Sequence, residues 1–361
     1  MPIKVLIVDD MATYRSIIAR SLSLIDNVEV VGKVSNGKKA LDFLLQHEVD
    51  LVTLDVEMPV MDGLSTLQEL RSKRKNVDVV MLSGLSEQAA QLTIKCLELG
   101  AVDFVLKPQS ASFLENQNQL LEHLKNIIAN LSRKLMFKSS ARRTLRPKPP
   151  PVLPTHPRRT TRLSKPKIVM IGVSTGGPKA LGEVFSNFRD PLPFPILIVQ
   201  HMPPKFTASL AENLNKKGPV HVVEGVDGDV LKNNTAYIAP GGFHMHLFKD
   251  DDFGLVLGTS REKPVNSCRP SVDVLFESAV PIFKRGEVLC FIMTGMGKDG
   301  ADGALALSKA GAYVVSQSEQ SCTIYGMPKS VEDMGYQNEV LDLKDIAPFI
   351  TKSAKIGALS R

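Results

Sequence analysis

Cysteine is scarce in this sequence: Cys96, Cys268, Cys290 and Cys322 lie far apart and form no C-x-x-C pair. We therefore expect neither a zinc site nor a disulfide framework, and we expect all four cysteines to be reduced and structural. Long apolar runs are missing as well. No run approaches the roughly 18–20 residues of a membrane span, and the opening stretch MPIKVLIVDD is too short and too acidic for a signal peptide. These absences predict a cytoplasmic protein.

Acidic residues are missing from one segment. From Lys138 to Lys167 the chain carries ten Lys or Arg and seven prolines but no Asp or Glu, which leaves 34 basic and 38 acidic residues elsewhere. This segment has few large apolar side chains, so it cannot bury enough surface to become ordered. We expect a disordered, basic, proline-rich linker over residues 138–166. It is either a solvated tether or a basic arm that attracts an acidic partner.

Short apolar runs alternate with helical patterns on both sides of this linker. Five strands and five helices alternate before it. After it the alternation resumes, with a hairpin-like zone over residues 235–258. The pattern predicts the α/β class with two doubly wound parallel-sheet domains. The first is five-stranded and flavodoxin-like and covers residues 1–125, with a final helix that runs to about 135; the second is larger, contains the hairpin and covers residues 167–355.

Polar residues stand at the strand ends of the first domain. Asp9 and Asp10 follow the first strand, Asp55 ends the third, Ser83 the fourth, and Lys107 follows the fifth. In a parallel sheet these ends meet at one edge. Each aspartate alone fits a helix cap, but three carboxylates together repel one another and need a cation, for which Mg²⁺ is suited. The arrangement predicts a carboxylate that accepts a phosphoryl group with the help of Mg²⁺ and Lys107.

The motifs VDD, LDVEMPVMDG, MLSG and LKP occur in this order, and with them residues 1–125 resemble the receiver domain of bacterial response regulators. The resemblance implies that Asp55 is the phosphorylated residue. It also implies that Asp9, Asp10 and Asp55 bind Mg²⁺ together with the backbone carbonyl of Glu57. A histidine kinase of the chemotaxis type is then the expected phosphodonor.

The same resemblance implies three further roles around the phosphate. Lys107 is expected to pair with it, Ser83 to supply the switch hydroxyl, and Phe104 to be the switch aromatic residue. It also implies a cis peptide bond between Lys107 and Pro108. A phosphate of about −2 charge at this edge would control whatever follows in the chain.

The second domain opens with IVMIGVSTGGPKAL, residues 168–181. Ser174 follows a run typical of a buried strand and precedes a helix, inside a G-x-S-x-G frame. The stretch is a nucleophile turn, a phosphate-binding loop or a plain turn. It lacks the Lys and Ser or Thr of a Walker loop and the spacing of a Rossmann loop, which removes the second possibility. We expect Gly176 and Gly177 to leave room for a substrate beside Ser174.

A serine nucleophile needs a base and an orienting acid. His201 directly follows the apolar run FPILIVQ, which places it at the functional edge of the sheet. Asp299 lies in the loop MTGMGKDGADG after a later strand. Ser174, His201 and Asp299 all come from strand ends, which favours this triad. Asp302 is the alternative helix cap in that loop.

One alternative keeps the α/β-hydrolase order of serine, acid and histidine. It pairs Asp227 or Asp229 with His244 or His246, because no histidine follows Asp299. We prefer the triad of Ser174, His201 and Asp299, because all three residues lie at strand ends.

The stretches IGVSTGGP, VQHMP, YIAPGGFHM, RPSVDVLFES, TGMGKDGADG and IYGMP resemble the catalytic domain of chemotaxis receptor-glutamate methylesterases. The resemblance implies Ser174 as nucleophile, His201 as general base and then acid, and Asp299 as its orienting carboxylate. It further implies that Thr175 supports the histidine and that the backbone N–H of Met296 helps to form the oxyanion hole. No cofactor is expected for hydrolysis.

The resemblance also implies the substrate, which is the cytoplasmic helices of methyl-accepting chemoreceptors. Glutamyl methyl esters would lose methanol, and specific glutamines would lose ammonia. Contact with the membrane would be indirect, through these receptors. We expect Arg269 and Asp273 either to cap a helix and pair at the surface or to hold the acidic receptor helix.

Three rival functions differ in class. A general serine esterase or amidase with a receiver would use the same triad. A phospho-dependent binding module would use the Ser174 stretch only as a turn. A transcription factor is disfavoured, because the second domain shows no helix-turn-helix pattern and no basic excess. We expect no nucleic-acid partner.

Overall fold

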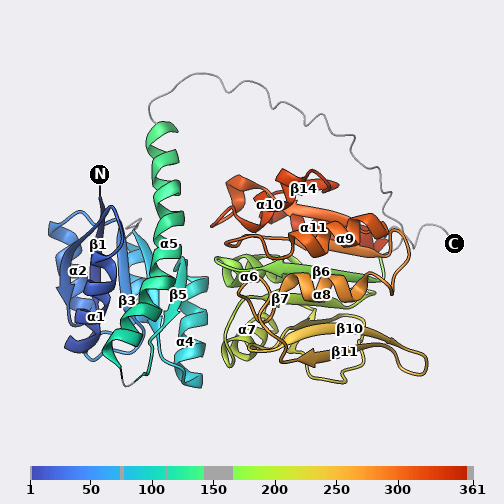
Figure 1. The fold of residues 1–361 in the computed structure, drawn as a ribbon, viewed down its shortest axis with the longest axis horizontal. Helices are drawn as coiled ribbons and strands as arrows, with labels where there is room; N and C mark the ends of the chain where they lie inside the picture. Colours follow the sequence, from blue (N-terminus) through green and yellow to red (C-terminus); the bar gives the residue numbers. More distant parts are fainter. Residues whose placement is uncertain (1, 74–76, 111, 142–165, 356–361) are drawn as a thin grey trace. The chain divides into compact units, whose positions relative to one another are not determined.

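The computed structural model describes residues 2–73, 77–110, 112–141 and 166–355. The chain divides into two compact units, Met1–Leu153 and Pro154–Arg361. Each unit has its own sheet and its own helices (Figure 1). The units are described separately below.

The first unit alternates strands and helices without interruption. Its strands form one parallel sheet in the order β2-β1-β3-β4-β5, the flavodoxin-like arrangement that the sequence predicts. The elements are β1 (Ile3–Val8), α1 (Ala12–Ser23), β2 (Val28–Val34), α2 (Gly37–Gln46), β3 (Leu51–Asp55), α3 (Gly63–Ser72), β4 (Asp78–Ser83), α4 (Glu87–Glu98), β5 (Asp103–Leu106) and α5 (Phe113–Ala141).

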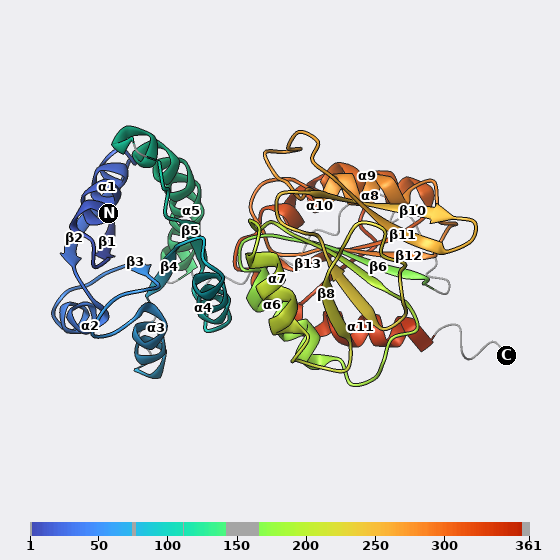
Figure 2. The same ribbon diagram turned by 90° about the horizontal axis from the view of Figure 1, so that it is seen from below.

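Helices cover both faces of this sheet (Figure 2). On one face α1 and α5 bury Ile18, Leu22, Leu120 and Leu124 against the strands. The central strands are apolar on both sides, as expected for a parallel sheet between two helical layers. Helix α5 ends at Ala141, beyond the end near residue 135 that we expected. Most of the expected linker, residues 142–165, lies outside the described residues.

The second unit contains a larger sheet, and its elements are β6 (Ile168–Val173), α6 (Gly177–Asn187), β7 (Ile196–Gln200), α7 (Phe206–Leu214), β8 (His221–Glu224), β9 (Thr235–Ile238), β10 (His244–Asp250), β11 (Gly254–Ser260), α8 (Val272–Ala279), β12 (Val288–Ile292), α9 (Ala301–Ala310), β13 (Tyr313–Gln317), η1 (Glu319–Ser321), α10 (Met327–Met334), β14 (Glu339–Leu341) and α11 (Leu343–Lys355). Seven strands are parallel, in the order β14-β13-β12-β6-β7-β9-β8, and β10 and β11 form a separate antiparallel hairpin. Helices α8 and α9 cover one face of the large sheet, and α6, α7 and α11 cover the other (Figure 2).

The hairpin that we expected over residues 235–258 is wrong at its start. Residues 235–238 form β9, which pairs with β7 and β8 in the parallel sheet, so only β10 and β11 belong to the hairpin. The run TAYI is fully buried, and an apolar run of this length fits a parallel strand as well as a hairpin arm.

The strand order of the large sheet sets where the predicted triad of Ser174, His201 and Asp299 lies. The chain runs from β6 to β7 on one side and later returns to β12 on the other. In doubly wound sheets a ligand crevice lies beyond the carboxyl ends of the strands at such a switch point. The residues that follow β6, β7 and β12 therefore share one crevice.

Two further expectations are settled here. Among the described residues no helix is long and apolar enough to cross a membrane. The cis bond expected between Lys107 and Pro108 is wrong: within the described chain the cis bond joins Arg269 and Pro270. The carbonyl oxygen of Pro108 instead accepts a hydrogen bond from the hydroxyl of Tyr14 at 2.7 Å.

Candidate functional site

Two carboxylates and one lysine meet at the carboxyl edge of the first sheet. Asp9 follows β1, Asp55 ends β3, and Lys107 follows β5. The Lys107 Nζ atom lies 2.7 Å from Oδ2 of Asp9 and 2.6 Å from Oδ2 of Asp55. Both carboxylates are almost completely buried. The structure thus brings three of the five side chains that the sequence places on one rim into direct contact.

Burial is the largest influence on the pKa values of the two carboxylates in this cluster. It raises the pKa of Asp55 to about 6, although the nearby Lys107 ammonium acts in the opposite direction. The pKa of Asp9 is raised for the same reason. Burial lowers the pKa of Lys107, but the two carboxylates outweigh burial and raise it. One ammonium therefore does not compensate the cost of burying two carboxylates.

The residues present fit a divalent cation. Asp9, Asp10 and Asp55 each offer a carboxylate oxygen, and these atoms lie within 4.8 Å of one another. Asp10 is exposed, so the cluster opens to solvent on one side. Hard oxygen ligands of this kind suit Mg²⁺, and a cation would supply the positive charge that the buried pair lacks. The Glu57 backbone N–H points to Oδ1 of Asp55 at 3.4 Å, which keeps that residue beside the cluster.

The predicted switch residues lie around the cluster with their own partners. The hydroxyl of Ser83 donates to the Gly84 carbonyl oxygen and accepts a hydrogen bond from Oγ1 of Thr93 at 2.8 Å. In this structure the hydroxyl is therefore engaged with α4. Phe104 is half-buried on β5. Sequence reasoning missed Tyr14, whose ring lies 4.8 Å from Nζ of Lys107 as a cation–π partner.

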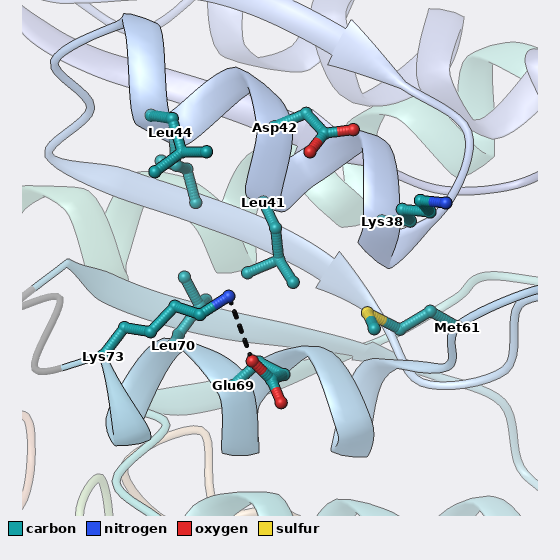
Figure 3. Close-up of a pocket in the computed structure, with 9 residues that line it drawn as sticks. Lys38, Leu41, Asp42, Leu44, Met61, Glu69, Leu70 and Lys73 are labelled. Atoms are coloured by element: carbon teal, nitrogen blue, oxygen red, sulfur yellow. Dashed lines mark ion pairs between the residues drawn. The ribbon is translucent and has the colours of Figure 1, made fainter.

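A groove in the same unit lies between α2 and α3 (Figure 3). Leu41 and Leu44 of α2 face Leu70 of α3, and Glu69 pairs with Lys73 at 3.1 Å across its rim. None of the residues predicted for phosphorylation or metal binding lines it. The groove is therefore separate from the acidic cluster.

The second site lies beyond β6, β7 and β12. The β6–β7 register places Val173 opposite Gln200, so Ser174 and His201 leave adjacent strands side by side. The His201 backbone N–H also donates to the Val173 carbonyl oxygen at 3.1 Å. Nε2 of His201 lies 2.7 Å from Oδ2 of Asp299. The three residues of the preferred triad are thus gathered at one crevice, with the Ser174 hydroxyl free of hydrogen bonds to other described residues.

The imidazole and the carboxylate form a tightly coupled buried pair. Burial alone lowers the pKa of His201, but the hydrogen bond with Asp299 and the neighbouring Cys268 outweigh it and raise the pKa to about 9. Burial raises the pKa of Asp299, but its hydrogen bonds with His201 and Ser271 reverse this and hold the pKa well below the usual range. The aspartate therefore stays ionised and stabilises an imidazolium.

Asp299 is held by donors that sequence reasoning missed. The hydroxyl of Ser271 donates to its Oδ1 at 2.7 Å, the Val272 backbone N–H donates to Oδ2 at 2.7 Å, and the Asn266 amide donates to Oδ1 at 3.0 Å. Val272 begins α8, so the carboxylate also lies at the positive end of that helix. Two of these donors, Ser271 and Val272, belong to the motif RPSVDV. Nothing in the spacing of that motif predicts that its serine contacts Asp299.

The structure corrects one of the expectations for Arg269 and Asp273, namely the surface pairing of Asp273. Asp273 is buried in the first turn of α8, where its Oδ1 accepts the Gly303 backbone N–H at 2.7 Å and ties α8 to α9. Burial raises the pKa of Asp273 to about 7. Surface pairing is therefore wrong for this residue. Arg269 donates to the backbone carbonyl oxygens of Arg261 and Glu262.

Backbone donors surround the crevice. The Met296 N–H, in the loop after β12, makes no hydrogen bond to another described residue. Thr294 fixes this loop, because its hydroxyl binds the Thr175 carbonyl oxygen at 3.0 Å and its carbonyl oxygen accepts the Ser174 N–H at 3.0 Å. Thr175 itself is buried beside Ser174. Thr294 thus ties the loop that contains Met296 to the backbone of Ser174 and Thr175, and a backbone N–H in such a loop is the kind of donor that an oxyanion hole uses.

The two glycines after Ser174 serve packing, which corrects the expectation of substrate room. Gly176 has φ +78°, and a Cβ there would lie 2.4 Å from Oγ1 of Thr323. A Cβ on Gly177 would lie 1.9 Å from Oε1 of Gln200. Gln200 in turn donates from Nε2 to the Ser174 carbonyl oxygen at 3.0 Å. The space beside the glycines is therefore filled by protein that positions the serine backbone.

The hydrolase-order alternative is wrong. His246 contacts the Ser260 hydroxyl at 2.9 Å, and His244 contacts the Lys263 carbonyl oxygen and the Ser271 N–H. Asp227 accepts hydrogen bonds from Thr259, and Asp229 accepts one from the Val226 N–H. Neither histidine pairs with either aspartate.

Comparison with known proteins identifies the family of the chain. A family model described as "CheB methylesterase" matches residues 169–350, and one described as "Response regulator receiver domain" matches residues 5–119. A relative from Desulfotalea psychrophila, named protein-glutamate methylesterase/protein-glutamine glutaminase, is 42% identical over 98% of this chain and 99% of its own. A Bacillus subtilis relative of the same name is 39% identical, also over 98% and 99%.

A solved structure resembles the second unit. The Thermotoga maritima CheB methylesterase catalytic domain aligns with a TM-score of 0.50 and 39% identity, over 52% of this chain and 98% of that one. The sequence matches extend over nearly the whole chain, and the family model falls on the unit that contains Ser174, His201 and Asp299. The chain therefore belongs to the CheB methylesterase family, with a response regulator receiver domain in front of the methylesterase domain.

Proposed function

We propose that this chain is a phosphorylation-activated protein-glutamate methylesterase and protein-glutamine glutaminase that acts on methyl-accepting chemoreceptors and so gives sensory adaptation in chemotaxis. The observation that carries the proposal is the His201–Asp299 pair beside Ser174, on a chain that also has the acidic cluster of a receiver. Near full-length relatives with this double name support it. The enzyme is a hydrolase.

The hydrolytic step starts at Ser174. His201 offers Nε2 to Asp299, so its other nitrogen, Nδ1, is the atom that takes the serine proton. The freed oxygen attacks the ester carbonyl carbon and a tetrahedral oxyanion forms. Asp299 stays ionised and stabilises the imidazolium that results.

The oxyanion is stabilised by backbone donors. The Met296 N–H makes no hydrogen bond within the described part of the chain, and α6 begins at Gly177 and turns its positive end toward the site. The imidazolium then protonates the departing methoxide, which leaves methanol and an acyl group on Ser174. Water activated by His201 releases the glutamate. With a glutamine substrate the leaving group is ammonia, and the other steps are unchanged.

The receiver supplies the control. Asp55 is the carboxylate that accepts the phosphoryl group, and Lys107 pairs with the phosphate. Asp9, Asp10, Asp55 and the Glu57 carbonyl oxygen would hold Mg²⁺, which neutralises phosphoryl charge during transfer when it is bound. Ser83 and Phe104 respond to the new charge. Their release from present contacts, such as that of Ser83 with Thr93, is the local event of the switch.

Partners and location follow from this function. A chemotaxis histidine kinase supplies the phosphoryl group, and the cytoplasmic helices of chemoreceptors supply the esters and amides. We place the protein in the cytoplasm, with residues 1–125 as receiver, 138–166 as linker and 167–355 as catalytic domain.

Methanol release from methylated receptor membranes tests the proposal. Ser174→Ala is expected to reduce the rate by several orders of magnitude, because it removes the hydroxyl that forms the acyl-enzyme in the proposed mechanism. Ser186→Ala is the matched control and retains the rate, because Ser186 is an exposed serine on α6 whose hydroxyl donates to the Glu183 carbonyl oxygen. Near-normal release by Ser174→Ala would refute the serine mechanism.

A further inference from the structure

The nitrogen of His201 that serves Ser174 already has a neighbour. Sγ of Cys268 lies 3.6 Å from Nδ1 of His201. Cys268 is half-buried, and the His201 side chain keeps 13% of its surface exposed, so the pair is not sealed from solvent. A thiol at this atom has no part in the mechanism above.

A tight turn fixes the cysteine in place. Val265 and Cys268 exchange two backbone hydrogen bonds, of 3.1 and 2.8 Å. The two residues between them, Asn266 and Ser267, have φ values of 50° and 62°, which is uncommon for residues other than glycine. The Asn266 amide also donates to Asp273 at 2.8 Å and to Asp299 at 3.0 Å. The sulfur is therefore positioned by the same network that holds the orienting aspartate.

The spacing of sulfur and nitrogen suits a tetrahedral metal ion. Zn²⁺ binds sulfur at about 2.3 Å and imidazole nitrogen at about 2.1 Å, and a tetrahedral angle between these bonds separates the two atoms by about 3.6 Å. The observed separation is 3.6 Å. The same separation fits a hydrogen bond between the two groups, which a shared ion would replace.

The rest of the imidazole is arranged as in a zinc site. A histidine that binds a metal usually donates its other ring N–H to a carboxylate, which fixes the ring. Asp299 accepts this hydrogen bond from Nε2 at 2.7 Å. Its oxygens also accept hydrogen bonds from Ser271, Val272 and Asn266, so it orients the ring and is not itself a ligand.

We propose that Cys268 Sγ and His201 Nδ1 form a binding site for a thiophilic divalent cation such as Zn²⁺, and that occupation of this site blocks hydrolysis. Binding forms one bond from the metal to the thiolate and one to Nδ1, and the thiol proton leaves to solvent. Water fills the remaining positions of the ion. No zinc motif could be read from the sequence, because the two ligands are separated by 67 positions.

A metal ion bound to Nδ1 of His201 would inhibit hydrolysis. With its Nδ1 lone pair bound to the metal, His201 cannot take the proton of Ser174. This consequence rests on the proposed function, whereas binding of the metal does not. Mg²⁺ prefers oxygen ligands and is not expected to compete at this site.

Cobalt is a direct probe of the site. The full chain is titrated with Co²⁺ under excess Mg²⁺, which fills the carboxylate cluster of the receiver. One equivalent is expected to produce a thiolate-to-cobalt charge-transfer band in the near ultraviolet, and Zn²⁺ is expected to abolish it. Cys268→Ser should remove the band, and Cys322→Ser, at a half-buried cysteine elsewhere, should keep it. Absence of the band in the wild type, or its survival in Cys268→Ser, would overturn the proposal.

Inhibition of methanol release is measured on the same variants. Zn²⁺ should inhibit wild type and Cys322→Ser equally, a chelator should restore the rate, and Cys268→Ser should need at least tenfold more Zn²⁺ for the same inhibition. Equal sensitivity of Cys268→Ser and wild type would contradict the proposal. A chain that binds cobalt through Cys268 but releases no methanol even without metal would refute the proposed function alone.

Discussion

Nε2 of His201 lies 2.7 Å from Oδ2 of Asp299, and this contact leaves Nδ1 as the ring nitrogen that is not engaged by the carboxylate. In the proposed mechanism Nε2 donates to this carboxylate, which leaves Nδ1 as the base. Nδ1 lies beside a sulfur atom, and Ser174 leaves the neighbouring strand. Catalysis and the proposed metal inhibition therefore compete for one atom.

Asp299→Asn tests the orienting carboxylate. The amide cannot stabilise an imidazolium, and it can fix the wrong tautomer, so kcat should fall by a factor on the order of 10³–10⁴ while the fold is kept. Methanol release under saturating substrate measures this. The control is Asp302→Asn, at an exposed aspartate in the first turn of α9, where the rate should stay within about twofold of wild type. Equal losses in both variants would show that the loop and not the carboxylate is responsible.

The pH dependence of catalysis follows from the pKa of His201. The base must be neutral to accept a proton, and its pKa is raised to about 9, so kcat/KM should fall as the pH drops below about 9. Cys268 is one of the groups that raise this pKa, so Cys268→Ala should shift the midpoint to lower pH. Profiles of kcat/KM for wild type and variant, measured in metal-free buffer, provide the check. An unchanged midpoint would mean that the sulfur does not act on Nδ1.

Lys107→Ala tests the buried charges of the receiver. It removes the only cation that pairs with Asp9 and Asp55 among the described residues, and removal of one partner from a buried ion pair costs roughly 3–5 kcal/mol. Urea unfolding of the full chain, followed in the transition of the first unit, measures the loss. Lys4→Ala breaks the exposed pair with Glu48 and should cost no more than about 1 kcal/mol. Similar costs for the two variants would contradict the burial argument.

Gly177→Ala tests the packing behind the nucleophile. The new methyl group would overlap Oε1 of Gln200, and overpacking of this kind typically costs about 1–3 kcal/mol. Displacement of Gln200 also releases the Ser174 carbonyl oxygen, so activity should fall along with stability. Gly84→Ala, where the nearest atom is 3.9 Å from the new Cβ, is the control for a glycine with room. Unchanged activity in Gly177→Ala would show that Gln200 does not position the serine.

Residues at strand ends could be predicted from the sequence because parallel strands bring their carboxyl ends to one edge. This rule placed Asp9, Asp55 and Lys107 together, and it placed His201 beside Ser174. The donors to Asp299 could not be found in the same way. Asn266 reaches it through a turn whose two residues have positive φ without being glycine, and such a turn leaves no pattern in the sequence.

Other errors have equally local causes. The strand β9 was assigned to the hairpin because a short apolar run does not reveal its partner. Gly176 and Gly177 were expected to make room for substrate, but a glycine pair looks the same whether a ligand or a neighbouring side chain fills the space. The contact of Cys268 with His201 depends on the fold of the whole second unit.

The most direct test of the central claim is methanol release from methylated receptor membranes by the full chain, with and without a small phosphodonor and Mg²⁺. The phosphodonor should raise the rate of wild type, should leave Asp55→Asn at its basal rate, and should not produce release by Ser174→Ala. An equal increase in Asp55→Asn and wild type, or release by Ser174→Ala at the wild-type rate, would contradict the account.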